Sequence, residues 1–433
     1  MSNYKQNKYS KQSGFKNRND NYVPPQNNNV SLQNNNVNEN TDSREEKQTF
    51  NDNKFKLLES FEELKLKENL LRGIYAYGFE VPSKIQSYAI PYILDKKDII
   101  AQSQSGTGKT GAFTIGVLSM IDESQNYPQG LIICNTHELA SQIYSVISEL
   151  ARYMDLKFGL LIGGIHLSKN IEDAKSCHIL VGTPGRTRDL IERGVLNTKA
   201  LKIFVMDEAD ELLHREFLEQ TKYIIKEISH DTQVCIFSAT LPEETLNVTK
   251  NFMPDPVRIL VEKEELSLDL IKQYYVNVQH EQNKFGTLDD LYNKLSINQC
   301  IIYVNSVKKA EILKDDLTKR MHVVELIHSK LDNKSRMDIM AKFRRGEFRV
   351  LISTDLICRG IDIHHINYVI NYDIPYDVHS YLHRIGRSGR FGKRGIAINF
   401  VTKYDYHQMK SIEHHYQIKI ESLPDPSIIN TDV

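Results

Sequence analysis

The strongest constraint on the fold is a loop rich in glycine and hydroxyl residues at positions 101–110, AQSQSGTGKT. The loop follows the short run Asp-Ile-Ile at 98–100 and precedes residues 111–118, whose apolar side chains recur at helical spacing. A strand, a loop and a helix in this order allow backbone amides and a helix N-terminus to bind phosphate. In such a site Lys109 would reach the β and γ phosphates, and the Thr110 hydroxyl would ligate magnesium.

The loop departs from the usual phosphate-binding pattern at one position. That pattern begins with a glycine five residues before its second glycine, and Ser103 occupies the place here. Taken alone, the loop fits two interpretations, which are a nucleotide site and a Gly/Ser turn that caps a buried helix. The rest of the sequence has to decide between them.

Length and composition exclude several classes of protein. A chain of 433 residues accommodates two or three domains of about 150 residues each, and 40% hydrophobic content is typical of a soluble globular protein. With a net charge of −1, nucleic acid would have to bind at local clusters of Lys and Arg. Five singly spread cysteines favour reduced intracellular thiols over disulfides or a zinc site. No long apolar run or signal-peptide core is found, so a membrane or secreted protein is not expected.

The hydrophobic pattern predicts an α/β protein with two parallel-sheet domains behind a disordered tail. Residues 1–53 carry Asn tracts that bury too little to fold, although their Lys and Arg could touch nucleic acid. From Phe55 onward, short apolar runs alternate with helical segments, which predicts parallel sheets covered by helices on both faces. The expected domains are 54–260 and 271–433, joined by a charged linker at 261–270. The expected strands are 98–101, 131–134, 179–181, 203–206, 234–237, 300–304, 323–327, 350–352, 369–371 and 396–401.

Acidic residues follow the predicted strand at 203–206. Open α/β sheets bind ligands at the carboxyl ends of their strands, where Asp207 and Glu208 would lie. Asp207 is suited to hold magnesium, and Glu208 to orient and deprotonate an attacking water. A helix cap is the alternative interpretation of the same residues. The next strand ends in Ser238-Ala239-Thr240, whose hydroxyls are expected to bond back to the carboxylates of the Asp207-Glu208-Ala209-Asp210 cluster.

Further motifs accompany the loop and the acidic residues. Together they are Gly78-Phe79-x-x-Pro82-x-x-Ile85-Gln86, residues 101–110, Asp207-Glu208-Ala209-Asp210, Ser238-Ala239-Thr240, Thr183-Pro184-Gly185-Arg186, Ser353-Thr354-Asp355, Arg359-Gly360-Ile361-Asp362 and residues 383–390, HRIGRSGR. With these motifs the chain resembles the DEAD-box RNA helicases of superfamily 2, over residues 55–425. The branch that the chain is most similar to is translation initiation factor 4A with its exon-junction relative. This resemblance implies two RecA-like domains.

The resemblance implies a site for ATP and magnesium between the two domains. Arg387 and Arg390 lie three apart, on one face if helical, and would act as arginine fingers on the γ phosphate. Because the fingers and the phosphate loop belong to different domains, hydrolysis should require domain closure. The implied catalytic residues are Glu208, Asp207, Lys109, Arg387 and Arg390; nucleotide contacts are Phe61, Phe79, Gln86, Ser105, Gly106, Thr107, Gly108, Lys109, Thr110 and Asp362; magnesium ligands are Thr110 and Asp207; coupling residues are Ser238, Thr240 and Asp210.

The RNA contacts implied by the resemblance go mainly to phosphate and sugar. Three motifs depart from the family pattern. Pro-Thr-Arg-Glu-Leu-Ala reads Asn135-Thr136-His137-Glu138-Leu139-Ala140, His-Gly-Asp reads His328-Ser329-Lys330, and Gln-x-x-Arg begins with Asn333. Since histidine is largely neutral at pH 7, we expect weakened or pH-sensitive RNA affinity. The implied RNA contacts are Thr136, His137, Gly163, Gly164, Thr183, Pro184, Gly185, Arg186, Arg336, Thr354, Arg359 and Gly360.

These observations predict an ATP-dependent RNA helicase that unwinds short duplexes locally, in translation initiation or mRNA processing. The expected partners are single-stranded or locally duplexed RNA and, by resemblance, a scaffold protein of repeated helices. A cytoplasmic or nuclear monomer is expected. The main alternative is an ATP-gated RNA clamp within a ribonucleoprotein assembly, which would use the same residues. Gln86 and the Asp-Glu-Ala-Asp motif argue against a DNA helicase, and the complete catalytic set argues against an inactive scaffold.

Overall fold

The computed structural model describes residues 55–214, 216–261, 271–295, 299–355, 366–388 and 395–424. The tail expected at 1–53 and nearly all of the expected linker lie outside the described residues, as do Arg359, Gly360, Asp362 and Arg390. We call the described part of residues 55–261 the first lobe and that of residues 271–424 the second lobe. None of the described helices has the length and apolar character needed to cross a membrane.

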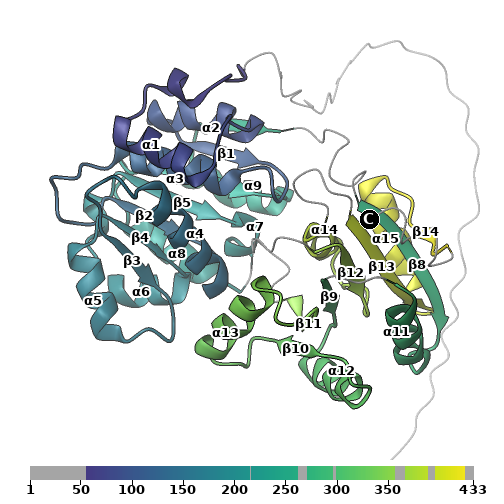
Figure 1. Ribbon diagram of the computed structural model, residues 1–433. Coiled ribbons are helices and arrows are strands. Elements are labelled where there is room, and N and C mark those ends of the chain that lie inside the picture. The colour runs from purple at the N-terminus through teal and green to yellow at the C-terminus, as the bar shows by residue number, and fades with distance from the viewer. Residues whose placement is uncertain are drawn as a thin grey trace, which may run out of the picture. The chain divides into compact units, whose positions relative to one another are not determined.

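The first lobe is built on a seven-stranded parallel sheet in the order β3-β4-β2-β5-β6-β1-β7 (Figure 1). Its strands are β1 (Ile99–Gln102), β2 (Gly130–Ile133), β3 (Phe158–Leu161), β4 (Ile179–Gly182), β5 (Ile203–Asp207), β6 (Gln233–Ser238) and β7 (Val257–Leu260). Its helices are α1 (Glu68–Tyr77), α2 (Lys84–Leu94), α3 (Lys109–Met120), α4 (His137–Leu150), α5 (Leu167–Ser176), α6 (Pro184–Glu192), α7 (Ala209–Leu212), α8 (Leu218–Glu227) and α9 (Glu243–Thr249), with 3-10 turns η2 (Phe61–Leu64) and η3 (Thr198–Ala200).

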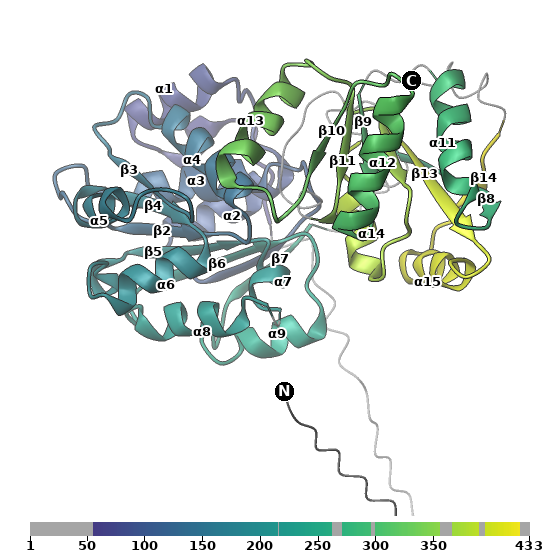
Figure 2. The ribbon, with the colours of Figure 1, turned by 90° about the horizontal axis from the view of Figure 1, so that it is seen from below.

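Helices cover both faces of this sheet, and successive strand residues alternate between two cores. Ile203 and Val205 pack toward α1 to α4, whereas Phe204 and Met206 pack toward the core that includes α6 and α8. Figure 2 shows these two helix layers on opposite sides of the strands. Because a strand covered on both faces has no solvent side, its sequence is apolar throughout, as predicted.

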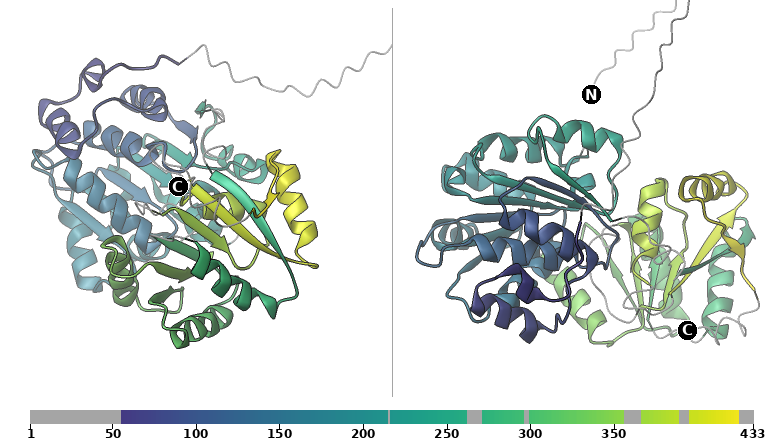
Figure 3. Two further views of the ribbon diagram at one scale, coloured as in Figure 1. Left: turned by 45° about the vertical axis from the view of Figure 1, so that its right-hand side comes forward. Right: turned by 90° about the horizontal axis from the view of Figure 1, so that it is seen from above.

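The second lobe contains another seven-stranded parallel sheet, in the order β10-β11-β9-β12-β13-β8-β14. Its long strands β8 and β13 run side by side (Figure 3). The strands are β8 (Ile271–Gln279), β9 (Cys300–Tyr303), β10 (Val324–Ile327), β11 (Val350–Ser353), β12 (Tyr368–Asn371), β13 (Gly395–Thr402) and β14 (Glu421–Ser422). The helices are α11 (Asn283–Lys294), α12 (Val307–Lys319), α13 (Asn333–Arg344), α14 (Val378–Ile385) and α15 (Tyr406–Tyr416).

The two sheets have the same topology. When the strands of each lobe are numbered from its own first strand, both orders read 3-4-2-5-6-1-7. Strand β5 therefore corresponds to β12, and β1 to β8. The predicted fold class, two RecA-like α/β domains with parallel sheets, is confirmed.

The expected strands correspond to observed ones with ends shifted by at most one residue, but four observed strands, β3, β7, β8 and β14, were missing from the prediction. Strand β3 has Gly159 among its large apolar residues and is buried only at alternate positions, so its apolar run in the sequence is weak. Strand β14 has only two residues, both exposed. Strand β7 is mostly half-buried, as expected for an edge strand of its sheet.

Candidate nucleotide and RNA site

The phosphate-binding loop joins β1 to α3, as the sequence predicts. Gly106 and Gly108 have φ angles of 84° and 102°, in the left-handed region that favours glycine. Lys109 begins α3 and is buried, and its ammonium donates to the carbonyls of Ser103 at 2.6 Å and Gln104 at 3.0 Å. Ser103, which replaces the first glycine of the pattern, shares a 2.6 Å hydrogen bond between its hydroxyl and that of Thr107. The departure at Ser103 therefore adds a bond within the loop.

Gln86 links the loop to α2. Its side-chain oxygen accepts from the Ser83 amide at 2.8 Å, and its nitrogen donates to the Gly108 carbonyl at 3.3 Å. A Cβ atom at Gly111 would lie 2.5 Å from that nitrogen and 3.0 Å from the Phe79 ring. Glycine at 111, which the sequence analysis did not single out, is what allows Gln86 and Phe79 to approach the first turn of α3.

The two aromatic residues expected near the base are placed differently. Phe61 is completely buried in the core, whereas Phe79 is half-buried, and their ring centroids lie 6.4 Å apart. Phe79 is therefore the ring with an accessible surface, and the buried Phe61 ring stacks against it.

An acidic cluster lies at the carboxyl edge of the first sheet. Asp207 ends β5, and Glu208 follows it with a φ of 53°, a left-handed conformation that is unusual for any residue but glycine. Both carboxylates are buried, and the outer oxygen Oε2 of Glu208 has no hydrogen-bond partner among the described residues. A buried carboxylate oxygen without a donor is an acceptor ready to take a proton from water.

The hydroxyls at the end of β6 bond to this cluster as expected. Ser238 donates to Oδ1 of Asp210 at 2.8 Å, and Thr240 donates to Oδ2 of the same carboxylate at 2.5 Å. Asp210 is therefore fixed by the neighbouring strand end, which leaves Asp207 and Glu208 as the carboxylates that face the phosphate loop.

The electrostatics of the cluster show a surplus of buried negative charge. Burial, together with the neighbouring Glu208 charge, raises the pKa of Asp207 to about 7. Burial also lowers the pKa of Lys109, against the opposing attraction of Glu208 and Asp207. The cluster would be stabilised by an additional cation, and the oxygen ligands Asp207 and Thr110 are of the kind that magnesium prefers.

Two residues of the second lobe approach the same cluster. His383 on α14 places Nε2 at 3.5 Å from Oδ2 of Asp210. The positive charge of Arg387 adds to the lowering of the Lys109 pKa, so this guanidinium lies near the phosphate loop. Helix α14 ends at Ile385, before Arg387, so the helical face expected for Arg387 and Arg390 does not form at Arg387. Arg390 and Asp362 lie outside the described residues.

Most of the predicted RNA contacts line one open pocket of about 460 Å³. Thr136 and Thr183 are the residues before the first turns of α4 and α6, so two helix N-termini bring partial positive charge to it. Gly163, Gly185 and Arg186 also line the pocket, as do His137 and Arg336. Gly164, Pro184 and Thr354 are not among its lining residues.

His137 stands between the backbone of the first lobe and an arginine of the second. The Gly163 amide donates to its Nε2 at 3.3 Å, and Arg336 Nη2 lies 3.0 Å from its Nδ1. Arg336 also pairs with Glu138, with 3.2 Å between Nε and Oε1, and both side chains are buried. The histidine that replaces the family arginine thus contacts the positively charged Arg336 through its Nδ1.

Four residues of the pocket were missed by the sequence analysis as RNA contacts. Phe217 and Gln220, at the start of α8, line the pocket but belong to none of the motifs used for prediction. Asn135 and Ser329 also line it, and both sit in the stretches already noted as departures from the family pattern. Proximity to those departures was the available signal for Asn135 and Ser329.

The chain is similar to known proteins over most of its length. The sequence matches the DEAD/DEAH box helicase family over residues 83–248 and the helicase conserved C-terminal domain over residues 283–392. The chain is 49% identical to the ATP-dependent RNA helicase FAL1 of Eremothecium gossypii, over 84% of this chain and 92% of that protein. It is 50% identical to the ATP-dependent RNA helicase eIF4A of Kluyveromyces lactis, over 85% of this chain and 93% of that protein.

This chain belongs to the DEAD-box helicase family.

Among solved structures, this DEAD-box protein resembles Saccharomyces cerevisiae Dbp5 bound to RNA and ADP BeF3. The TM-score is 0.82 at 35% sequence identity, covering 87% of this chain and 98% of that one.

Proposed function

We propose that this DEAD-box protein is an ATP-dependent RNA helicase that couples ATP binding and hydrolysis to RNA clamping and local duplex unwinding, in translation initiation or mRNA processing. The observation that carries the proposal is the buried acidic cluster beside Lys109, with the uncompensated Glu208 oxygen. The pocket at the N-termini of α4 and α6 supplies the second half, a surface suited to a phosphate backbone.

Each side chain has a task that its surroundings support. Lys109 would hold the terminal phosphates, and Gln86 and Phe79 would contact the base. Glu208 would orient the attacking water and accept its proton, while Asp210 is kept out of that role by its bonds to Ser238 and Thr240. Arg387 would add positive charge on the opposite side of the phosphates. Thr110 and Asp207 would hold magnesium, which supplies charge neutralisation to the phosphates.

The decisive experiment measures ATP hydrolysis with single-stranded RNA, with matched DNA and without nucleic acid, for the wild type and for Glu208→Gln. Stimulation by RNA alone, lost in the variant, is the expected result. Equal stimulation by DNA would point to a DNA helicase, and hydrolysis indifferent to RNA would contradict a coupled helicase.

The departures at His137 and Ser329 favour one further candidate, an ATP-gated RNA clamp whose turnover a partner controls. Both residues line the RNA pocket, so they act on RNA binding and not on the nucleotide. Slow RNA release in the presence of ATP, measured by competition with unlabelled RNA, would support the clamp; rapid release coupled to duplex separation would support the helicase.

We also propose a monomer that works in the cytoplasm, or alternatively in the nucleus, with a scaffold protein of repeated helices. The similarity to eIF4A supports this proposal. Co-purification followed by light scattering would test both the partner and the monomeric state.

A further inference from the structure

Arg384 does a different task from Arg387, although both belong to the HRIGRSGR motif. The Arg384 side chain is completely buried on α14, and its five N–H groups all have acceptors. Its guanidinium also lies over the Tyr303 ring, 5.2 Å from the centroid. The acceptors are Asp355 Oδ1 at 2.6 Å, Asp355 Oδ2 at 3.0 Å, Asn305 Oδ1 at 2.8 Å, Asn371 Oδ1 at 3.3 Å and the Asp373 carbonyl at 2.7 Å. Because these donors are all engaged within the lobe, Arg384 is a positioning residue.

The strongest of these contacts reaches the loop after β11. Asp355 receives two bonds from Arg384 in the forked geometry that makes arginine and carboxylate pairs both strong and directional. Asp355 directly follows Thr354, one of the residues that the resemblance implies as RNA contacts, although Thr354 does not line the pocket at α4 and α6. The pair therefore joins an RNA-contact segment to α14.

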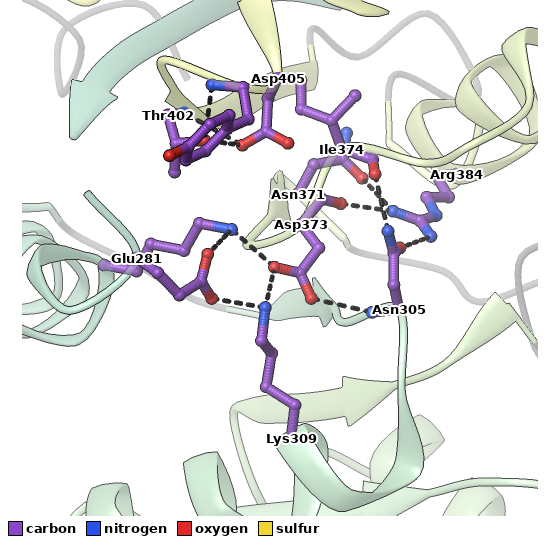
Figure 4. Close-up of polar contacts among 11 residues, drawn as sticks. Glu281, Asn305, Lys309, Asn371, Asp373, Ile374, Arg384, Thr402 and Asp405 are labelled. Carbon is purple, nitrogen blue, oxygen red and sulfur yellow. Dashed lines mark hydrogen bonds and ion pairs between the residues drawn. The ribbon is translucent and has the colours of Figure 1, made fainter. Parts of the chain in front are cut away.

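The other contacts of Arg384 are held in place by a cluster of charges around Asp373, in which Lys284 and Asp373 are buried, Lys309 is half-buried and Glu281 is exposed (Figure 4). Asp373 accepts 2.6 Å bonds from both Lys284 and Lys309 on Oδ1, and its Oδ2 accepts from the Asn305 amide at 3.0 Å. Glu281 pairs with the same two lysines. Burial favours a higher pKa for Asp373, but Lys284 and Lys309 outweigh it and hold that pKa below its usual value. Asp373 therefore stays ionised. Its contacts hold in place two of the acceptors of Arg384, the Asp373 carbonyl and the Asn305 side chain.

Asp355 is the most exposed of the residues that bond to Arg384. Its side chain is 47% exposed, while those of Arg384 and Asp373 are 0% and 8% exposed. A change at the end of β11 can therefore move Asp355 without breaking the buried cluster.

The path from Arg384 to Arg387 is short. The Arg387 amide donates to the Arg384 carbonyl at 3.3 Å, and its Nε donates to the His383 carbonyl at 3.1 Å. The orientation of the Arg387 side chain is thus set by the backbone that carries Arg384.

We propose that the Asp355–Arg384 pair makes ATP hydrolysis depend on RNA, because RNA held at Thr354 fixes Asp355, and Asp355 fixes the end of α14 that presents Arg387 to the phosphates. This inference rests on the proposed function, since it names how one site of that helicase signals to the other.

The test compares the turnover number of the full chain at saturating ATP, with and without saturating single-stranded RNA, for the wild type and Asp355→Asn. The asparagine keeps the shape but removes the charge and one of the two matched acceptors. The ratio of RNA-stimulated to RNA-free turnover should fall about tenfold, which corresponds to losing one charge-assisted bond. The KM for ATP and the RNA concentration giving half-maximal stimulation should stay within about twofold.

Two further variants separate coupling from stability. Arg384→Lys keeps the charge but loses the fork, so it should lower the same ratio, and combining it with Asp355→Asn should add no further loss. Lys309→Met removes one of the two lysines on Asp373 while Lys284 still holds that carboxylate, so it should lower the melting temperature and leave the ratio unchanged.

The outcomes are distinct. A melting temperature that falls in Asp355→Asn while the ratio is kept would make the pair a structural brace and overturn the proposal. Loss of RNA affinity with full stimulation at saturating RNA would also overturn it, by making Asp355 a direct RNA contact. If the wild type itself shows no RNA stimulation, the proposed function fails and this inference falls with it.

Discussion

The first and second lobes place a lysine and an aspartate at equivalent positions of the same sheet topology, but only in the second lobe do the two side chains form an ion pair. In the first lobe, Lys109 starts the helix after the first strand and Asp207 ends the fifth strand. In the second lobe, Lys284 lies at the start of α11, after that lobe's first strand, and Asp373 follows its fifth strand. Lys284 and Asp373 form a direct 2.6 Å ion pair, whereas Lys109 donates to two loop carbonyls.

The difference shows what distinguishes a binding site from a structural core on the same fold. In the second lobe the charges are matched, and the pKa of Asp373 is lowered despite burial. In the first lobe the pKa of Asp207 is raised by burial and by Glu208. The lysine and carboxylates of the first lobe therefore remain able to bind a ligand. The corresponding lysine and aspartate of the second lobe pair with each other and stabilise that lobe.

The largest expected effect comes from removing the second lobe's contribution to the first lobe's site. Arg387→Ala should lower RNA-stimulated turnover about a thousandfold, roughly 4 kcal/mol, because it removes a positive charge of the second lobe that lies near the phosphate loop. Steady-state hydrolysis measures this. Arg345→Ala, an exposed arginine paired with Glu347, serves as the control and should behave as wild type. A loss below about tenfold would mean that Arg387 does not face the phosphates.

Breaking the matched pair of the second lobe should cost stability. Asp373→Asn leaves Lys284 and Lys309 with one carboxylate between them, so unfolding of this lobe should become easier by about 3 kcal/mol. Urea titration with hydrogen exchange at β12 reports it.

The pH dependence of the same variant has a definite sign. Because the folded pKa of Asp373 is lowered, its stabilisation is present above the ordinary aspartate pKa and is lost as pH falls through the folded pKa. The difference between wild type and Asp373→Asn should therefore shrink in acid. Asp338→Asn, on an exposed pair, should show no such change.

The corresponding change in the first lobe should act in the opposite direction. Asp207→Asn removes one charge from a cluster whose members disfavour one another, so without magnesium it should stabilise the first lobe by about 1 to 2 kcal/mol. The effect is largest at pH 8, above the pKa of about 7, where the wild-type carboxylate is charged in the folded state. Calorimetry checks it, and a lower melting temperature would show that Asp207 supports the fold as Asp373 does.

The smallest effect is expected at the RNA pocket. His137→Arg puts a permanent charge beside the helix N-termini, so it should tighten RNA binding several-fold, about 1 kcal/mol, and steepen the salt dependence by about one phosphate contact. Fluorescence anisotropy with a short RNA measures both. A variant that binds no tighter would count against the expectation that His137 weakens RNA binding.

The sequence predicts the nucleotide side of the molecule better than the RNA side, for a physical reason. Lys109, Asp207 and Ser238 follow strands in fixed order, so topology alone brings them to one edge of the sheet. Gln86 was also expected, but Gly111 was not, because its importance depends on how closely α2 approaches α3. The RNA pocket combines helix starts with residues of unrelated segments such as Phe217, whose meeting depends on tertiary packing.

The charge network of the second lobe was not visible in the sequence. Lys284 and Glu281 precede Asp373 by about ninety residues in a region that reads as an ordinary charged helix. Nothing in their spacing shows that the Lys284 side chain is buried in the folded protein, at 2% exposed, while other lysines nearby stay exposed. Burial of a charge depends on the partner that the fold supplies, and that partner is distant in the chain.

The strand order also bears on how the protein folds as it leaves the ribosome. In each sheet the strand made first ends up between the two made last, β1 between β6 and β7, and β8 between β13 and β14. Neither sheet can be completed until its final strand has been synthesised. The first lobe can close only after Leu260 has emerged, and from then on it can protect its core while the second lobe is still being made.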